Sequence, residues 1–287
     1  MRPTPFWFAV AIALIALPAW AGSSTIVEAE GNACMGDDLS RKQTETQAMA
    51  DAKRVAAESA ATYVRSQSEV EDAMLTKDLI AAYSAAQVTV LEVLQKGWYR
   101  DQAAGDCFGM RIRTEVTPDE AAIARVAKKA GGGGIDDPTA PLAVKVWTSQ
   151  EHYRPSERMQ IYLKGNKPFY ARVVYRQVDG AQIQLLPNPY RGANHFQGGV
   201  VYAIPGDGDR FDLDVSPPFG KESVSVYAST APLGEVPTQE AGGVYVVEGD
   251  VGVRSRGIKL VASQGGSHTT PAAVEFAEEQ AEMTTGP

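Results

Sequence analysis

The stretch ARVVYRQVDGAQIQL, residues 171–185, carries the strongest structural signal in this chain. Ala171, Val173 and Tyr175 lie opposite Arg172 and Arg176, and after the turn Ile183 and Leu185 lie opposite Gln182 and Gln184. Apolar residues at every second position are typical of a strand with one buried face. The Asp179-Gly180 pair between the two runs favours a two-residue hairpin turn. The stretch therefore predicts an antiparallel β-hairpin.

The same alternation continues on both sides of this hairpin, over residues 141–262. Short strands with a single apolar face need a second sheet to cover that face. We therefore expect an immunoglobulin-like β-sandwich over 141–262. Residues 263–287 are rich in Gly, Ser, Thr, Pro and Glu, and we interpret them as a disordered acidic tail with at most a short helical turn near Val274 to Met283.

Residues 24–118 predict a small helix-on-sheet domain, which makes the fold class α+β. Ser40 and Gln43 form a capping box at the start of a helix. Ala48, Ala52, Val55, Ser59 and Tyr63 follow at helical spacing, and the small alanines allow the helix to lie close to a sheet. Residues 119–140 then predict a helical tail and a Gly-rich linker, in which Gly131 to Gly134 form a flexible joint between two independent domains.

The first 21 residues are typical of a secretory signal peptide. Arg2 precedes an apolar run, and Ala19-Trp20-Ala21 provides the small residues of a cleavage site. We expect cleavage after Ala21 and a periplasmic or secreted mature protein with no further integral membrane segment. Loss of Arg2 would move the net charge from −8 to −9, which disfavours nucleic acid as a partner.

Cys34 and Cys107 are the only cysteines in the sequence. In an oxidising compartment two cysteines most simply form one structural disulfide. The alternative is a reactive or metal-binding pair. It is disfavoured because neither cysteine lies in a C-x-x-C motif or near a histidine in the sequence.

No catalytic motif is present: G-x-S-x-G, H-E-x-x-H and a Walker loop are all missing from the sequence. We therefore expect a protein that is not an enzyme and that uses no cofactor and no metal. The best acidic cluster comprises Asp207, Asp209, Asp212 and Asp214. Asp212 and Asp214 alternate with apolar residues, so a turn followed by a solvated strand is the favoured interpretation, with calcium as the alternative.

The loop over residues 186–199 is the candidate binding site. It combines two prolines with residue types that are common in interfaces, and the candidates are Tyr190, Arg191, His195 and Phe196. The competing interpretation is that these aromatic side chains close one end of the sandwich.

Three blocks of sequence, at residues 164–175, 184–190 and 226–234, occur in an order that resembles the domain-of-unknown-function 4384 family over about 144–260. That resemblance implies an exported or envelope-associated β-sandwich without an assigned activity. Residues 48–64 and 86–99 resemble the N-terminal domain of flagellar assembly protein T, which implies a small helix-on-sheet domain of envelope assemblies.

Two functions of different classes follow from these observations. The first is an exported, non-catalytic protein-interaction or assembly module of the bacterial envelope, with an envelope protein of unknown identity as partner. The second is a glycan- or peptidoglycan-binding module that uses exposed Tyr and Trp. A hydrolase with an unrecognised site is the third and least favoured hypothesis, and a substrate-panel assay tests it.

Overall fold

The structure is a computed structural model that describes residues 22–67, 81–83, 85–119, 121–122, 134–241, 244–257 and 273–287. It confirms the α+β class with a sandwich-like second half. The helices that the structure describes in full are α1 (Arg41–Gln67) and α4 (Val251–Ser255). The strands are β1 (Ser23–Cys34), β2 (Gln87–Asp101), β3 (Gly105–Thr117), β4 (Val144–Thr148), β5 (His152–Tyr153), β6 (Ile161–Gly165), β7 (Phe169–Arg176), β8 (Gln182–Leu186), β9 (His195–Phe196), β10 (Tyr202–Ile204), β11 (Lys221–Ser229), β12 (Thr238–Ala241), β13 (Val244–Val247) and β14 (Val274–Thr285).

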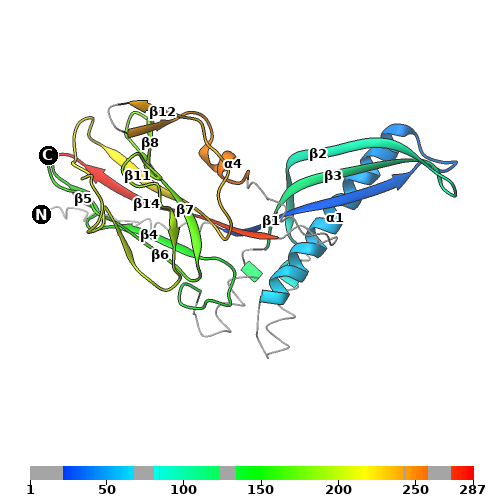
Figure 1. Ribbon diagram of the computed structural model, residues 1–287, viewed down its shortest axis with the longest axis horizontal. Helices are drawn as coiled ribbons and strands as arrows, with labels where there is room; N and C mark the ends of the chain where they lie inside the picture. Colours follow the sequence, from blue (N-terminus) through cyan, green and yellow to red (C-terminus); the bar gives the residue numbers. More distant parts are fainter. Residues whose placement is uncertain are drawn as a thin grey trace, which may run out of the picture.

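One large sheet runs through the whole molecule (Figure 1). Its order is β12-β13-β8-β7-β11-β14-β1-β3-β2, with β5 and β9 pairing to β14 and β7 beside this path. A second sheet of order β10-β6-β4 packs on the part that contains β7, β11 and β14. Between these two sheets lies the main apolar core, whose largest fully buried side chains include Phe169, Phe196, Ile161, Leu163 and Leu186.

The hairpin predicted from residues 171–185 is confirmed by β7 and β8. Tyr175 pairs with Ile183, and Arg176 pairs with Gln182. The turn uses Gly180 at a positive φ of 87°, a conformation that glycine adopts without steric cost. A bulge between Val173 and Val174 shifts the register of this pair of strands.

Helix α1 packs on one face of β1 and β3, because its buried stripe consists of small residues. Ala48 and Ala52 are fully buried, as predicted. The buried stripe then continues through Ala56, Ala60 and Val64, whereas the predicted Val55, Ser59 and Tyr63 lie one position off it and are half-buried. A Cβ atom on Gly31 of β1 would lie 2.3 Å from the carbonyl oxygen of Ala48, so the helix backbone approaches the strand closely. The capping box is also present, since the backbone N–H of Ser40 donates to the Gln43 side chain at 2.9 Å.

The expected disordered tail is wrong for residues 273–287. Residues 274–285 form strand β14, which pairs with β11 along nine residues and with β1 along four. The burial pattern of β14 explains this placement. Val274, Phe276 and Met283 are buried, Glu275 and Glu278 are ion-paired, and Glu282 is exposed. The acidic composition therefore conceals a strand with a large apolar component.

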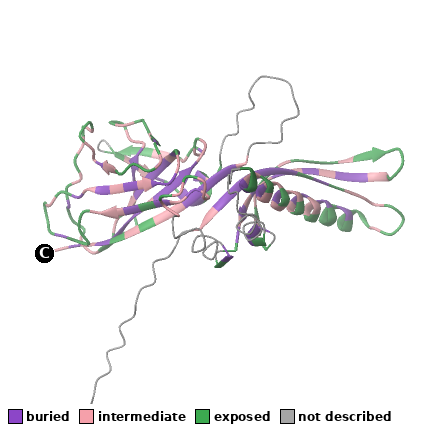
Figure 2. Ribbon diagram, turned by 90° about the horizontal axis from the view of Figure 1, so that it is seen from below, coloured by how far each residue is buried: buried purple, intermediate pink, exposed green. Residues whose placement is uncertain are grey.

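Strand β14 also joins the two halves of the molecule into one sheet. Ser23, Ser24, Thr25 and Ile26 of β1 pair with Ala277, Phe276, Glu275 and Val274, in that order. Figure 2 shows buried positions running along these strands from the sandwich into the helix-on-sheet half. The prediction of two independent domains did not anticipate this shared backbone pairing.

Several expectations lie outside the described residues. They are the signal peptide, most of the helical tail and the glycine joint predicted over 119–134, and the first part of the predicted disordered tail, up to residue 272.

Candidate binding surface

A short turn and an ion pair hold the loop that connects β8 to β9. The side-chain oxygen of Asn188 accepts hydrogen bonds from the backbone N–H groups of Tyr190 (2.8 Å) and Arg191 (2.7 Å). The guanidinium of Arg191 donates to Asp209 at 2.8 Å, and the Asp209 side chain is only 7% exposed. This loop is therefore fixed before any partner arrives.

Tyr190 is the candidate that the structure presents to solvent. Its exposed fraction is 54%, and its backbone is held in the Asn188 turn. Val200 and Val201 follow β9 and are also exposed, although the sequence-based candidates did not include them. Only the burial pattern could have found them, because Gly198 and Gly199 interrupt the alternation that would have shown which way each valine points.

Phe196 is a core residue, so its assignment as a contact residue is wrong. Its exposed fraction is 1%, and its ring stacks on Phe169 with centroids 5.4 Å apart. Tyr202 packs against the edge of the same ring at 4.9 Å. The competing interpretation, closure of the sandwich by aromatic side chains, applies to this residue.

Arg191 is largely engaged inside the protein, whereas His195 is exposed. The Arg191 guanidinium lies 5.5 Å from the centre of the Phe196 ring and is also bonded to Asp209, so much of its donor capacity is used inside the protein. His195 is exposed on β9, and its ring lies 4.7 Å from the ring of Tyr170. Tyr190 and His195 are therefore the two sequence-based candidates that remain accessible.

The acidic cluster is engaged with arginines. Asp209 binds Arg191 and also accepts from the backbone N–H of Gly206 at 2.8 Å. Asp212 and Asp214 lie at exposed positions, 3.3 Å and 3.8 Å from Arg158. The solvated strand expected here is not formed, because residues 211–215 contribute only an isolated β-bridge between Asp214 and Arg158. Within the described ranges, no group of three or more His, Cys, Asp or Glu side chains is arranged to hold a metal ion.

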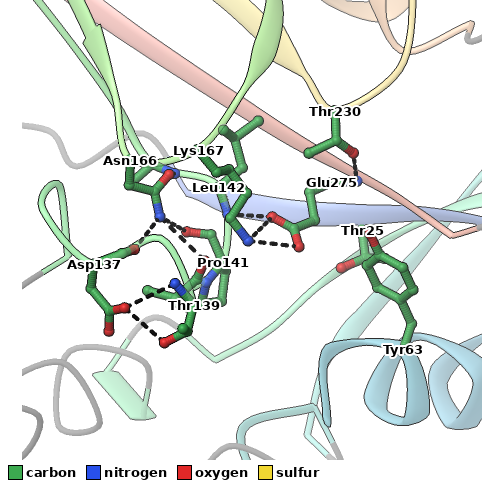
Figure 3. A network of polar contacts seen from close by, with 12 residues as sticks. Thr25, Tyr63, Asp137, Thr139, Pro141, Leu142, Asn166, Lys167, Thr230 and Glu275 are labelled. Carbon is green, nitrogen blue, oxygen red and sulfur yellow. Dashed lines mark hydrogen bonds and ion pairs between the residues drawn. The ribbon is translucent and has the colours of Figure 1, made fainter. Parts of the chain in front are cut away.

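A buried polar network lies where the two halves meet, and Figure 3 shows it from close by. Glu275 is 2% exposed, and its carboxylate accepts from Lys167, with the shortest separation 3.0 Å, and from the backbone N–H of Leu142. Thr230 binds the backbone of Glu275 in both directions, donating and accepting at 3.0 Å. The network therefore ties β14 to the β6–β7 turn and to the segment that leads into β4.

Two tyrosines from the helix-on-sheet half face this carboxylate. Burial raises the pKa of Tyr63 to about 12, and the negative charge of Glu275 acts in the same direction. Burial likewise raises the pKa of Tyr83 to about 12, and its hydroxyl lies 3.1 Å from that of Thr25. Glu275 is thus surrounded by neutral hydroxyls and one lysine, an arrangement that suits structural support.

The opposite face of the same sheet has its own cross-links. Arg256, next to α4, binds Glu115 of β3 at 2.8 Å and Glu278 of β14 at 3.0 Å. Ile26 of β1 joins an apolar cluster there with Tyr227 and Phe276. Both faces of the sheet therefore connect the two halves.

Arg172 is a buried guanidinium with neutral partners. It donates to Gln184, Ser255 and the carbonyl oxygen of Gly234 at 2.7 to 2.9 Å. Burial lowers the pKa of Arg172 to about 10. These bonds attach the segment around α4 to the sheet.

Cys34 and Cys107 form the predicted disulfide, which crosses from the end of β1 to β3. The two residues face each other in the register of these strands. The bridge lies at the opposite end of β1 from its pairing with β14.

Among the helices that the structure describes, none is both long and apolar enough to cross a membrane. No curated protein matches this chain. The resemblance of the N-terminal half to flagellar assembly protein T stays a prediction. The expected likeness of the sandwich half is confirmed, because residues 152–232, which contain β5 to β11, match the family described as "Domain of unknown function (DUF4384)".

Proposed function

We propose that this protein is an exported, non-catalytic interaction or assembly module of the bacterial cell envelope, with the loop around Tyr190 as its contact with an envelope protein. The observation that carries the proposal is the combination of an exposed aromatic side chain and a fixed loop. Tyr190 is 54% exposed, while Asn188 and the Arg191–Asp209 pair hold the backbone on both sides. A preordered aromatic residue adds contact area with little loss of conformational entropy.

The use of ionisable residues supports the non-catalytic part of the proposal. The buried Glu275 is paired with Lys167, and the buried Arg172 is bonded to three neutral acceptors. These groups join strands and turns, so their contacts have a structural explanation.

Site-specific photo-crosslinking in the periplasm tests the contact surface. A photoreactive residue in place of Tyr190 should give one discrete protein adduct, and the same residue in place of Val178 is the matched control. Val178 is also exposed (42%) but lies in the turn between β7 and β8. The proposal is wrong if position 190 gives no adduct or the same adducts as position 178.

A second experiment separates contact from folding. Tyr190→Ala should weaken capture of the crosslinked partner and leave the melting temperature nearly unchanged, because an exposed ring contributes little to stability. Arg191→Ala is unsuitable on its own, since it also removes the bond to Asp209. Export is tested by N-terminal sequencing of the mature protein, which should begin at Gly22.

A further inference from the structure

Two tight turns of the sandwich half are joined by one ion pair. The first turn spans residues 188–191, and the second spans residues 206–209. In each turn a backbone hydrogen bond links the last residue to the first, at 3.2 Å and 3.0 Å. Arg191 and Asp209 are these last residues, and their side chains meet at 2.8 Å. The two turns therefore lie within the reach of one arginine side chain.

The carboxylate of Asp209 holds the two turns together from the inside. Its side chain is 7% exposed, and it accepts from Arg191 and from the backbone N–H of Gly206, both at 2.8 Å. The guanidinium of Arg191 also lies 5.5 Å from the centre of the buried Phe196 ring. Salt screens a buried ion pair much less than an exposed one. The link between the turns is therefore part of the folded structure at any ordinary ionic strength.

The side chains at and beside the tips of these turns point to solvent. Tyr190 is 54% exposed, and Asp207 and Arg210 are exposed at and next to the second turn. Within the part of the chain that the structure describes, the side chains of Asp207 and Arg210 have no hydrogen-bond or ion-pair partner. The two turns thus present one aromatic ring together with one free charge of each sign.

This combination matches the surface of a folded protein better than a charged polymer. Interfaces between proteins place aromatic residues near the centre and polar residues at the rim. A polyanion would be repelled by Asp207, and a polycation would be repelled by Arg210. The complementary surface is a hollow for the ring of Tyr190, with a cation that faces Asp207 and an anion that faces Arg210.

We propose that the 206–209 turn is the second part of the contact surface around Tyr190, and that Asp209 is the positioning residue that keeps the two turns in one arrangement. This inference rests on the proposed function and extends it, because it assigns the turn that contains Asp207 to the same envelope-protein partner. Asp209 acts through its neighbours, since its own side chain is buried.

Photo-crosslinking at position 207 tests the extent of the surface. A photoreactive residue in place of Asp207 should give the same adduct as one in place of Tyr190, and Val178 remains the control position. An adduct at 190 with none, or a different one, at 207 overturns this inference alone. Absence of an adduct at 190 overturns the proposed function and this inference together.

Charge reversal tests the chemistry of the partner. Asp207→Lys should weaken capture by about tenfold, because it places a cation opposite the partner's cation. Glu240→Lys is the matched control, since Glu240 is an exposed acid on β12 and should leave capture unchanged. Equal losses for the two variants would refute the assignment of Asp207 to the surface.

Hydrogen exchange of the full mature chain tests the role of Asp209 without any partner. The backbone N–H of Arg191, which donates to Asn188, should exchange about tenfold faster in Asp209→Ala than in the natural protein. Asp209→Asn keeps an acceptor for Gly206, so its exchange rate should lie between the two. Unchanged exchange in Asp209→Ala overturns the positioning role.

A double-mutant cycle separates positioning from a general effect on stability. Asp209→Ala should weaken capture by about tenfold in the natural sequence and by at most about threefold when Tyr190 is already alanine, because the ring that it positions is then gone. Losses of equal size in the two backgrounds would show that Asp209 acts only through stability and would contradict the positioning role.

Discussion

Replacement of Glu275 by alanine should destabilise both halves of the protein together. Glu275 is 2% exposed, neutralises Lys167 and accepts from the backbone N–H of Leu142. Its own backbone pairs with Thr25 of β1 in the sheet that links the halves. The alanine variant would leave a mostly buried ammonium group and a backbone donor without partners.

The size of the effect follows from these lost contacts. Removal of one partner from a buried ion pair costs about 3–5 kcal/mol, and an unsatisfied buried donor costs about 1–3 kcal/mol. The two costs overlap because one side chain serves both groups, so we expect a loss of about 4 kcal/mol in the free energy of unfolding. For a protein of this size the melting temperature should fall by about 10 °C.

Chemical denaturation followed by circular dichroism measures this loss. Glu282→Ala is the matched control, since Glu282 lies on the same strand at an exposed position and should change stability by less than about 0.5 kcal/mol. The double variant Lys167→Met with Glu275→Gln removes both charges but keeps an acceptor for Leu142, so it should recover most of the stability. A loss below about 1 kcal/mol for Glu275→Ala, or two transitions of which only one moves, would refute the reasoning.

Three further predictions concern other links in the fold. Replacing Cys34 and Cys107 by serine should lower stability by about 4 kcal/mol, because the bridge closes a loop with a sequence separation of 73, and denaturation of both forms checks this value. The free energy of unfolding should fall as the pH rises from about 10 to 12. Burial holds the pKa of Tyr63 and Tyr83 at about 12 in the folded state against about 10 in the unfolded chain, so the folded protein retains protons that the unfolded chain loses. Tyr83→Phe should reduce the dependence of the unfolding free energy on pH, measured by urea titrations between pH 9 and 12. A chain that ends at residue 272 should lose its cooperative melt, because β11 and β1 would both lose the strand between them; a folded, cooperative product would contradict the central place of β14.

Local patterns predicted the parts of the fold that depend on neighbouring residues. The β7–β8 hairpin needed only alternation and a turn at Asp179-Gly180, and the start of α1 needed only the Ser40 and Gln43 pair. The disulfide followed from the number of cysteines together with the expected compartment. Each of these features is determined within a short stretch or by simple elimination.

The roles of Phe196 and Arg191 could not be predicted in the same way. Strand β9 has two residues, so it contains no alternation from which the buried face could be recognised. Phe196 is buried because Phe169 and Tyr202 lie beside it, and Arg191 is fixed by Asp209, eighteen residues later in the chain. The binding candidates on this loop therefore needed the three-dimensional contacts to be separated from the core.

The missed strand β14 shows why composition alone misleads here. Its acidic residues would repel one another in an isolated chain, and that property suggested disorder. In the fold, Glu275 faces Lys167 and Glu278 faces Arg256, both supplied by distant parts of the sequence. Acidic residues in a strand are thus compatible with burial when their counter-ions come from other elements.

The position of β14 also has a consequence for the proposed contact surface around Tyr190. Tyr190 belongs to the sandwich half, and one continuous sheet connects this half to the helix-on-sheet half. On one face of that sheet, Arg256 binds Glu115 of β3 and Glu278 of β14, and Ile26 of β1 packs in one apolar cluster with Tyr227 and Phe276. Backbone pairing of β14 with β1 therefore holds the loop around Tyr190 and the helix-on-sheet half in one sheet, so a protein partner bound at Tyr190 would keep a defined position relative to α1 and β3. Glu275→Ala should loosen the connection between β14 and β1 without changing the loop around Tyr190 directly.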